Sequence, residues 1–396
     1  MRMEFKGIGA LPDMSLDIDG LTVIAGQNST GKSTILKTIY CMLDPSADFA
    51  KKRDEEAMKT VSSLLMKTIL RKVPGMFSLD DSLIDKYISD LETQDLSSSE
   101  RQSLESVKSL RSGAMDADFH THLVGWDIES EFGRVGQFRS RNRASDSSVI
   151  VTHNGKERIF TATSQQISWK GPFEDLPDVI YYDTPFIVDE PLGRSIFPTH
   201  RGRLASLIRT ERDPNIVERM LSDKRLEAFE RCVSEIVPGR MRYDPKNDSM
   251  EYTENGDDPL DARNLAAGMK LFSIIRMLIE SGRITQDTVV ILDEPEIHLH
   301  PAWQVVLARA ILSLHSSIGC RIVLTTHSPL LLRAIQAYSD LERSSVRYYY
   351  LERDSTGNTV CEDLGSNPER VFDSMADAFE LVENLYYRDD SDDVGH

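Results

Sequence analysis

Short apolar segments near the N-terminus have the pattern of strands. Strands are predicted at Met3–Phe5 and Met14–Ile18, and the continuous apolar run Leu21–Ala25 is typical of a strand buried on both faces. From 46 to 111 the apolar residues are spaced by three or four, as between Met58 and Leu65, which predicts helices. The chain therefore begins as a sheet and continues into a helical insertion.

The middle of the chain has the alternation expected of an antiparallel sheet. Apolar residues alternate from Val124 to Ile128, which predicts a strand. Val149–Val151 and Arg158–Phe160 flank Asn154-Gly155, a dipeptide that favours a tight hairpin. The remaining predicted elements are the strand Val179–Tyr182, a helical stretch at 201–235, a hairpin at Met241–Tyr252, a helix ending near Gly282, the strand Val289–Leu292, a helix after Pro301 and the strand Ile322–Thr326.

The composition is that of a globular protein with a sizeable core. The 396 residues carry 64 acidic and 46 basic side chains, which gives a formal net charge of −18. No apolar run approaches the roughly 18 residues of a membrane span, and the N-terminus has no signal-peptide pattern, so we expect a cytoplasmic protein without membrane contact. The acidity excludes wholesale coating of nucleic acid. Free thiols are predicted for Cys41, Cys232, Cys320 and Cys361, which have no metal-ligand spacing.

A glycine-rich segment directly follows the first buried strand and matches a P-loop. Its glycines let backbone N–H groups surround phosphates, Lys32 places a cation at the β and γ oxygens, and the Ser33 hydroxyl is a ligand for Mg²⁺. The sequence therefore predicts binding of ATP with Mg²⁺. The predicted binding segment runs Gly26-Gln27-Asn28-Ser29-Thr30-Gly31-Lys32-Ser33-Thr34.

Two carboxylates end the predicted strand Val289–Leu292, as in a Walker B motif. Asp293 is predicted to hold Mg²⁺, and Glu294 is placed to polarise the attacking water. A second Asp-Glu-Pro at 189–191 is rejected, because Pro185 interrupts its strand and the later motifs do not follow it.

Lys32 and Asp293 lie 261 positions apart (293 − 32), a spacing typical of an ABC-type head with long inserted segments. Two further motifs of such a head are present. The segment from Asn264 to Lys270 opens a predicted helix before the Walker B strand, and His327 follows the next strand.

The sequence resembles ABC-type ATPases of the SMC/RecF/OLD group, and specifically the OLD-like branch common in bacterial anti-phage systems. The resemblance rests on Asp293-Glu294-Pro295-Glu296-Ile297-His298-Leu299-His300-Pro301 and Thr326-His327-Ser328-Pro329, and it covers 1–45 and 237–335. It implies catalytic roles for Glu294 and His327 and an α/β ABC-type head with an antiparallel β subdomain. It also implies a dimer in which the signature residues of one subunit, Ala266, Gly268 and Lys270, cap ATP held by another.

The resemblance divides the chain into six segments. Since only 69 residues follow His327 (396 − 327), too few for a Toprim nuclease domain, we expect none. The segments are the N-terminal part of the head (1–45), the helical insertion (46–115), a β-rich part (116–200), a helical segment (201–236), the C-terminal part of the head (237–350) and an acidic segment (351–396).

One signature position departs from the family. Ala266 stands where a serine is usual, which removes a hydroxyl that would reach the γ-phosphate. Backbone N–H groups at Gly268 and the helix start still permit capping, so we expect ATP hydrolysis that is slow.

Several weaker signals stay open. For Glu296, His298 and His300 a structural or interface role is favoured over metal binding, and His120 and His122 are expected to be surface residues of a strand. Three arginines alternate on a predicted strand and could meet DNA, although a salt-bridged edge explains them as well. They are Arg139, Arg141 and Arg143, and the γ-phosphate glutamine of the family could be Gln137, Gln165 or Gln166.

These features predict an ATP-gated sensor or scaffold of bacterial anti-phage defence that acts with a separate nuclease or toxin. The alternative is a DNA-repair or chromosome-associated clamp that uses the same head, and a transporter subunit is a weaker third possibility. The Glu296 position argues against transport, because transporter heads usually have Thr there.

Overall fold

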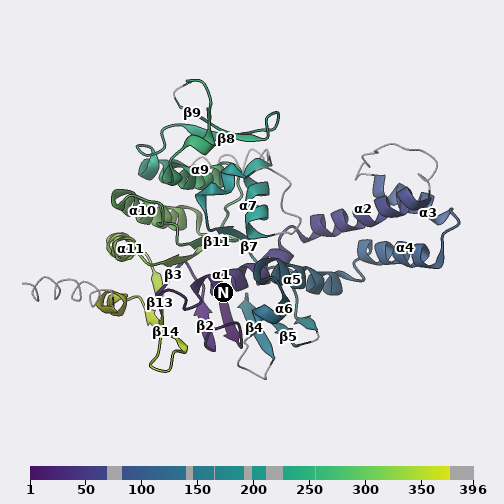
Figure 1. Cartoon of the computed structure of the whole chain (residues 1–396), viewed down its shortest axis with the longest axis horizontal. Coiled ribbons are helices and arrows are strands. Elements are labelled where there is room, and N and C mark those ends of the chain that lie inside the picture. The colour runs from purple at the N-terminus through teal and green to yellow at the C-terminus, as the bar shows by residue number, and fades with distance from the viewer. Residues whose placement is uncertain are drawn as a thin grey trace, which may run out of the picture.

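The computed structural model describes residues 1–68, 83–139, 146–164, 166–190, 199–210, 226–254 and 256–374. A six-stranded sheet in the order β14-β13-β3-β12-β11-β7 runs through the head (Figure 1). Five of its strands are parallel, and β14 pairs antiparallel at one edge. The strands are β3 (Leu21–Gly26), β7 (Asp178–Tyr182), β11 (Thr288–Asp293), β12 (Arg321–Thr326), β13 (Val346–Arg353) and β14 (Thr359–Gly365).

Both faces of this sheet are covered, which explains the uninterrupted apolar runs of its central strands. Val23 and its neighbours pack against one set of helices, while Ile24 packs against α1 and a second sheet on the other face. The helices are α1 (Lys32–Leu43), α9 (Ala267–Glu280), α10 (Pro301–Ile318) and α11 (Pro329–Glu342).

The second sheet is antiparallel, in the order β2-β1-β4-β5-β6, and a small sheet β10-β9-β8 lies near α9. The predicted hairpins at Asn154-Gly155 and at Met241–Tyr252 are confirmed. The strands are β1 (Arg2–Lys6), β2 (Met14–Asp17), β4 (Ser147–His153), β5 (Lys156–Ala162), β6 (Ile167–Lys170), β8 (Arg240–Asp244), β9 (Ser249–Thr253) and β10 (Leu260–Asp261). Short helices are η1 (Asp44–Ser46), α6 (Val135–Phe138), η4 (Pro185–Asp189), α7 (His200–Arg209) and η5 (Ala262–Asn264).

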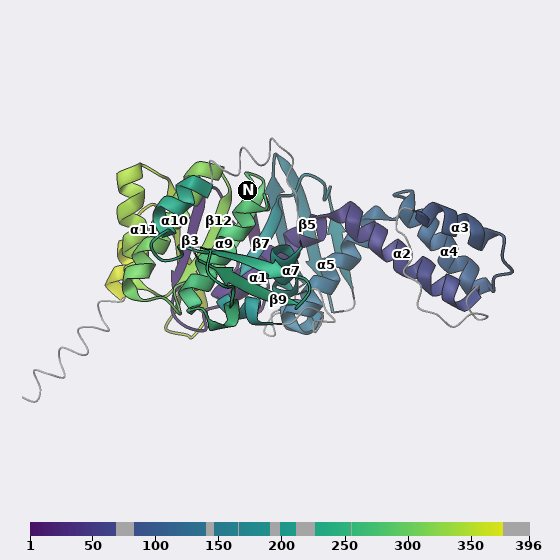
Figure 2. The ribbon, with the colours of Figure 1, turned by 90° about the horizontal axis from the view of Figure 1, so that it is seen from above.

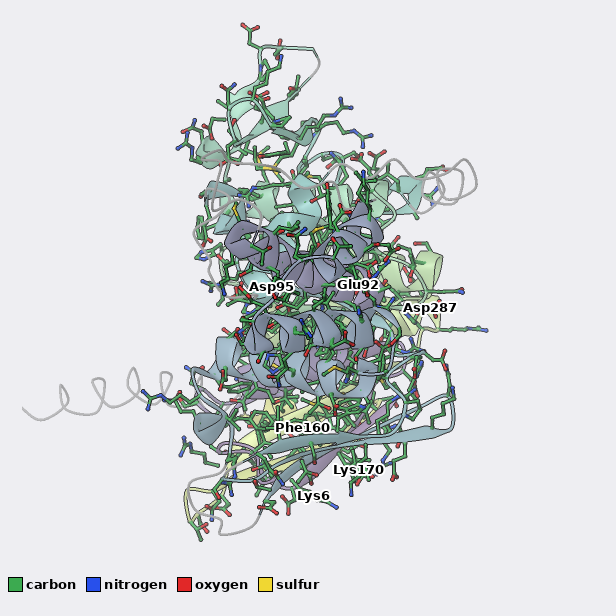
Figure 3. The ribbon with its side chains drawn as sticks, turned by 90° about the vertical axis from the view of Figure 1, so that its right-hand side faces the viewer. Lys6, Glu92, Asp95, Phe160, Lys170 and Asp287 are labelled. Carbon is green, nitrogen blue, oxygen red and sulfur yellow. The ribbon has the colours of Figure 1, made fainter. Side chains whose placement is uncertain are left out.

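The predicted helical insertion projects from the head as α2 (Phe49–Thr68), α3 (Ile84–Glu92) and α4 (Ser98–Arg111), and Figure 2 shows it at the end opposite α11. It has an apolar core of its own, which includes Val61, Leu91 and Leu104. Viewed end-on in Figure 3, Glu92 and Asp95 of the insertion face the viewer. The helix α5 (Asp116–Phe132) then leads back into the head.

The predicted strand at 124–128 is wrong, because this segment lies within α5. Val124 and Ile128 are four residues apart, so they share one helix face, and both are fully buried there. The same residues also fit the alternation of a strand. A segment of five residues is too short to distinguish the helical period from the strand period. The predicted β-rich part therefore begins with a helix rather than a strand.

The boundary predicted at 350/351 is also wrong. It would cut β13, and β14 extends the main sheet beyond it. The aromatic strand Tyr348–Tyr350 is buried against the head, so sheet pairing outweighs the acidic composition that suggested a separate segment. The acidic run 389–393 lies outside the described residues. Within the described ranges, no helix is long and apolar enough to cross a membrane.

His120 is fully buried in α5 rather than exposed on a strand. Its ring stacks on Phe173 with centroids 4.5 Å apart, and its Nε2 lies 2.9 Å from the Ser46 hydroxyl. Burial, together with the nearby Lys52 charge, lowers the pKa of His120 to about 3. The imidazole is therefore neutral in the folded protein.

We expect the folded state to lose stability on acidification through His120. The unfolded chain binds the proton near pH 6.5 and the folded chain near pH 3, so stability is complete above pH 6.5 and falls below it. The free energy of unfolding should change by up to about 1.4 kcal/mol per pH unit through this residue. In His120→Phe this part of the slope should vanish, measured by urea unfolding at pH 7.5 and 5.5. His122→Phe, at the exposed neighbouring position, is the control. An unchanged slope in His120→Phe would contradict the assignment.

Candidate nucleotide-binding site

The predicted P-loop joins β3 to α1 and requires glycine at two positions. Gly31 is the N-cap of α1 with φ of +98°, and a Cβ there would lie 2.6 Å from Leu11 Cδ2. A Cβ at Gly26 would lie 2.2 Å from the carbonyl oxygen of Leu351. The close approach of the loop to β13 therefore excludes any side chain at Gly26.

Lys32 is held inside the loop. Its Nζ donates to the carbonyl oxygens of Gly26 at 3.1 Å and Gln27 at 2.9 Å. Burial lowers its pKa, and the nearby charges of Glu294 and Asp293 oppose that shift. Asn28, Ser29 and Ser33 are exposed, Thr30 is buried and Thr34 is half-buried.

Asp293 ends β11, which lies in the same sheet as the P-loop strand β3. Its Oδ1 accepts a 2.6 Å bond from the Thr325 hydroxyl, and its Oδ2 accepts a 3.0 Å bond from the Tyr181 hydroxyl. These two donors leave the carboxylate little rotational freedom. The sequence prediction missed both partners. Thr325 lies beside the His327 motif, whereas no sequence signal singles out Tyr181.

Glu294 and His327 contact each other. The His327 Nε2 lies 2.8 Å from Glu294 Oε1. Burial and the Lys32 charge lower the pKa of His327, so the neutral ring carries its proton on Nε2 and donates to the carboxylate. Glu294 adopts φ of +48°, which is uncommon for glutamate, and its N–H donates to the Thr325 hydroxyl at 3.0 Å. The chain therefore turns out of β11 at Glu294.

Glu296 holds the segment that carries His327. Its Oε1 accepts bonds from the Thr326 hydroxyl at 2.6 Å and the His327 N–H at 3.0 Å. His300 caps α10, since its Nδ1 accepts from the Ala302 N–H at 3.3 Å, and the His298 ring contacts Phe186. Among the described residues, no group of three or more His, Cys, Asp or Glu side chains could hold a metal ion. The structural contacts of Glu296 and His300 agree with the favoured interpretation.

The signature segment begins α9 with an open end. Ala266 is the N-cap, is exposed and provides no side-chain cap. Gly268 is buried, and a Cβ there would lie 2.5 Å from Trp303 Cε3. The glycine is therefore needed for packing of α9 on α10 inside one subunit, whatever else its N–H contacts.

These residues fit a nucleotide with a divalent cation. The glycines leave room at the backbone, and the Lys32 ammonium donates to two carbonyl oxygens of the loop. The exposed Ser33 hydroxyl and the Asp293 carboxylate are oxygen ligands of the kind that Mg²⁺ prefers. When bound, the cation would neutralise phosphate charge. Glu294, fixed by His327, is placed to take a proton from water.

The sequence model of a family described as "AAA domain, putative AbiEii toxin, Type IV TA system" matches residues 21–333, which is most of the chain. The chain belongs to this family. It is an ABC-type ATPase of the OLD-like class, as its motifs predicted.

Two relatives of this ATPase have low sequence identity to it. A retron Vc95 probable ATPase from Vibrio cholerae is 23% identical over 79% of this chain and 67% of the relative. An OLD nuclease from Thermus scotoductus is 23% identical over 96% of this chain and 67% of the relative. A solved SMC head domain from Thermotoga maritima is 11% identical with a TM-score of 0.42, and the match covers 92% of this chain and 98% of that domain.

The structure corrects the prediction that Lys270 binds nucleotide in this ATPase. Lys270 is 1% exposed, and its Nζ lies 2.8 Å from both carboxylate oxygens of Asp189. Its ammonium is therefore committed to an ion pair inside the subunit. The second Asp-Glu-Pro is therefore not a Walker B motif. Its Asp189 ends the short helix η4 and pairs with Lys270.

Two of the three candidates for the γ-phosphate glutamine lie within the described residues. Gln137 lies on α6 and Gln166 just before β6, both with the antiparallel sheet, and Gln165 lies outside the described residues. The Walker B strand β11 lies between β12 and β7, and Asp183 follows β7. Asp183 lines a small hollow together with Glu294 and Ala267, and sequence reasoning missed it.

The predicted arginine strand is tested only in part. Arg139 forms an isolated bridge with Ile8 and is half-buried, so it is not on an open strand face. Arg141 and Arg143 lie outside the described residues.

Proposed function

We propose that ATP with Mg²⁺ bridges two subunits, held by the P-loop and Asp293 of one and by the start of α9 of the other. The observation that carries this proposal is the exposed, uncapped N-terminus of α9 at Ala266. Its free backbone N–H groups favour an anion such as the γ-phosphate. Glu294 and His327 are the catalytic pair, and Ala266, without the usual hydroxyl, makes turnover slow.

The proposed role is an ATP-gated sensor or scaffold in anti-phage defence, with a separate nuclease or toxin as effector. Support comes from the relatives, a retron ATPase and an OLD nuclease, and from the toxin–antitoxin description of the family. ATP-controlled association of the heads would be the switch that the effector reads. The protein would act in the cytoplasm.

Lys32→Ala tests this function. In the proposed complex the ammonium would donate to the phosphates, and one hydrogen bond between charged groups contributes about 1.5–3 kcal/mol, so ATP affinity should fall at least about 10-fold by calorimetry. Cells carrying the wild-type gene with its neighbouring genes should resist phages that plate normally on cells carrying Lys32→Ala. Lys51→Ala, which removes an exposed lysine of α2, is the control.

Two results would count against the proposal. Unchanged ATP affinity in Lys32→Ala would refute the nucleotide site. Equal phage plating with and without the wild-type protein, together with Lys32-dependent survival of DNA damage, would replace the defence role by the DNA clamp.

A further inference from the structure

His200 occupies a buried ion-pair cluster between three elements. Its Nδ1 and its backbone N–H each lie 2.8 Å from Glu131 Oε1, and its Nε2 lies 3.1 Å from Asp183 Oδ2. Glu131 is in the last turn of α5, His200 begins α7, and Asp183 follows β7. Burial lowers the pKa of His200, but Asp183 and Glu131 outweigh burial and raise it above its usual value. The raised pKa favours the imidazolium form of the ring, which lies between the two carboxylates.

The cluster reaches the nucleotide edge by two paths. The His200 ring stacks on Tyr181 with centroids 4.2 Å apart and planes 22° apart, and the Tyr181 hydroxyl donates to Asp293. On the other side, the Nζ of Lys37, a residue of α1, donates to the carbonyl oxygen of Glu131 at 3.2 Å. A shift of Glu131 therefore acts both on the Walker B aspartate and on the helix that begins at Lys32.

The helix α5 connects Glu131 to the helical insertion. The 17 residues of α5 span about 25 Å, and at its start Asp116 pairs with Arg53 of α2 at 3.4 Å. Because a helix is stiff over this length, a displacement of the insertion at Asp116 would be transmitted along α5 to Glu131.

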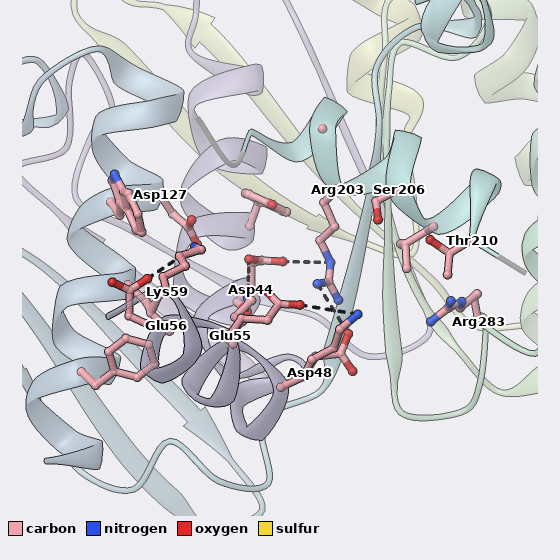
Figure 4. A pocket seen from close by; sticks show the side chains of 18 residues that line it. Asp44, Asp48, Glu55, Glu56, Lys59, Asp127, Arg203, Ser206, Thr210 and Arg283 are labelled. Atoms are coloured by element: carbon pink, nitrogen blue, oxygen red, sulfur yellow. Dashed lines mark hydrogen bonds and ion pairs between the residues drawn. The ribbon is translucent and has the colours of Figure 1, made fainter. Parts of the chain in front are cut away.

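The base of the insertion contacts α7 through a second set of ions. Lys52 of α2 and Arg203 of α7 both pair with Asp44, at 2.7 and 2.9 Å, and Figure 4 shows Asp44 with Arg203. These residues line a cleft of about 470 Å³. Among the described residues, the insertion thus meets α7 through ions around a cleft, while Phe49 of α2 packs on Phe119 and Phe173 beside it.

We propose that Glu131 and His200 are positioning residues that couple the helical insertion to the nucleotide site through Tyr181 and Asp293. This inference rests on the proposed function, and it assigns the regulation of the nucleotide site to the helical insertion. The buried ion pair alone could be purely structural, because such pairs often stabilise little. The experiment must therefore separate positioning from folding.

The test compares Glu131→Ala with Glu131→Gln, whose amide oxygen still accepts from His200. In Glu131→Ala, kcat for ATP should fall about 10–100-fold while KM changes less than about twofold, since misplacement of a catalytic group by about 1 Å has effects of this size. Glu131→Gln should restore most of kcat. Glu129→Ala, an exposed neighbour on the same helix, is the matched control.

Hydrogen exchange provides a readout besides activity. A non-hydrolysable ATP analogue with Mg²⁺ should slow amide exchange in both the P-loop and α5 of the wild type, and in Glu131→Ala only in the P-loop. Protection of the wild-type P-loop without protection of α5, or Glu131→Ala behaving like Glu129→Ala, would overturn the coupling alone. An unprotected wild-type P-loop would overturn the proposed function, and the coupling with it.

Discussion

Glu294→Gln is expected to reduce ATP hydrolysis about 100-fold or more while ATP with Mg²⁺ stays bound. Loss of a general base has effects of this size. The amide oxygen of Gln can still accept from His327 Nε2, now 2.8 Å from Glu294 Oε1, so the turn should keep its shape. The proposed metal ligands Asp293 and Ser33 are unchanged, and the closed, ATP-bound assembly should accumulate. Steady-state phosphate release and light scattering with ATP measure the two effects.

The chain contains its own control for this variant. Glu190 belongs to the second Asp-Glu-Pro but is exposed and follows the short helix η4 instead of a strand. Glu190→Gln should leave hydrolysis within about twofold, because surface substitutions usually have small effects. If Glu294→Gln hydrolyses ATP at the wild-type rate, Glu294 is not the base and the site assignment fails at its centre.

The nucleotide edge of the fold could be predicted because its signals are local. A doubly buried strand followed by a glycine loop, as at Leu21–Gly26, has few alternative structures. The strand ends at Asp293 and His327 were predicted for the same reason. The segment 124–128 failed because five residues fit both a helix and a strand, and the contacts that decide lie with Phe138, Phe160 and other distant residues.

The site shows the same division between local motifs and distant contacts. Residues of the P-loop and Walker B motifs were identified by type and spacing, yet the groups that fix them come from elsewhere in the chain. Tyr181 lies 112 positions from Asp293, and Asp189 lies 81 positions from Lys270. A lysine beside a signature motif looks like a phosphate ligand in sequence. Only the packing reveals that a half-buried carboxylate already holds it.

Capping of ATP by a second subunit is best tested at Ala266. Gly268→Asp is unsuitable, because any Cβ there meets Trp303 within the same subunit. Ala266 is exposed and is the N-cap of α9, where both Asp and Ser are favourable. Ala266→Asp and Ala266→Ser should each stabilise the isolated subunit by about 1 kcal/mol, which raises Tm by about 2 °C.

The two variants should diverge once ATP is added. In Ala266→Asp a carboxylate would face the γ-phosphate held by the partner, and like charges about 4 Å apart near a protein surface repel by about 4 kcal/mol. ATP-dependent association and hydrolysis should therefore fall at least about 100-fold. Ala266→Ser provides the hydroxyl that the family usually has, so association should tighten or turnover rise. Light scattering with and without ATP measures association. If Ala266→Asp associates and hydrolyses ATP like the wild type, the second subunit does not cap the nucleotide, and only nucleotide binding by the single head survives.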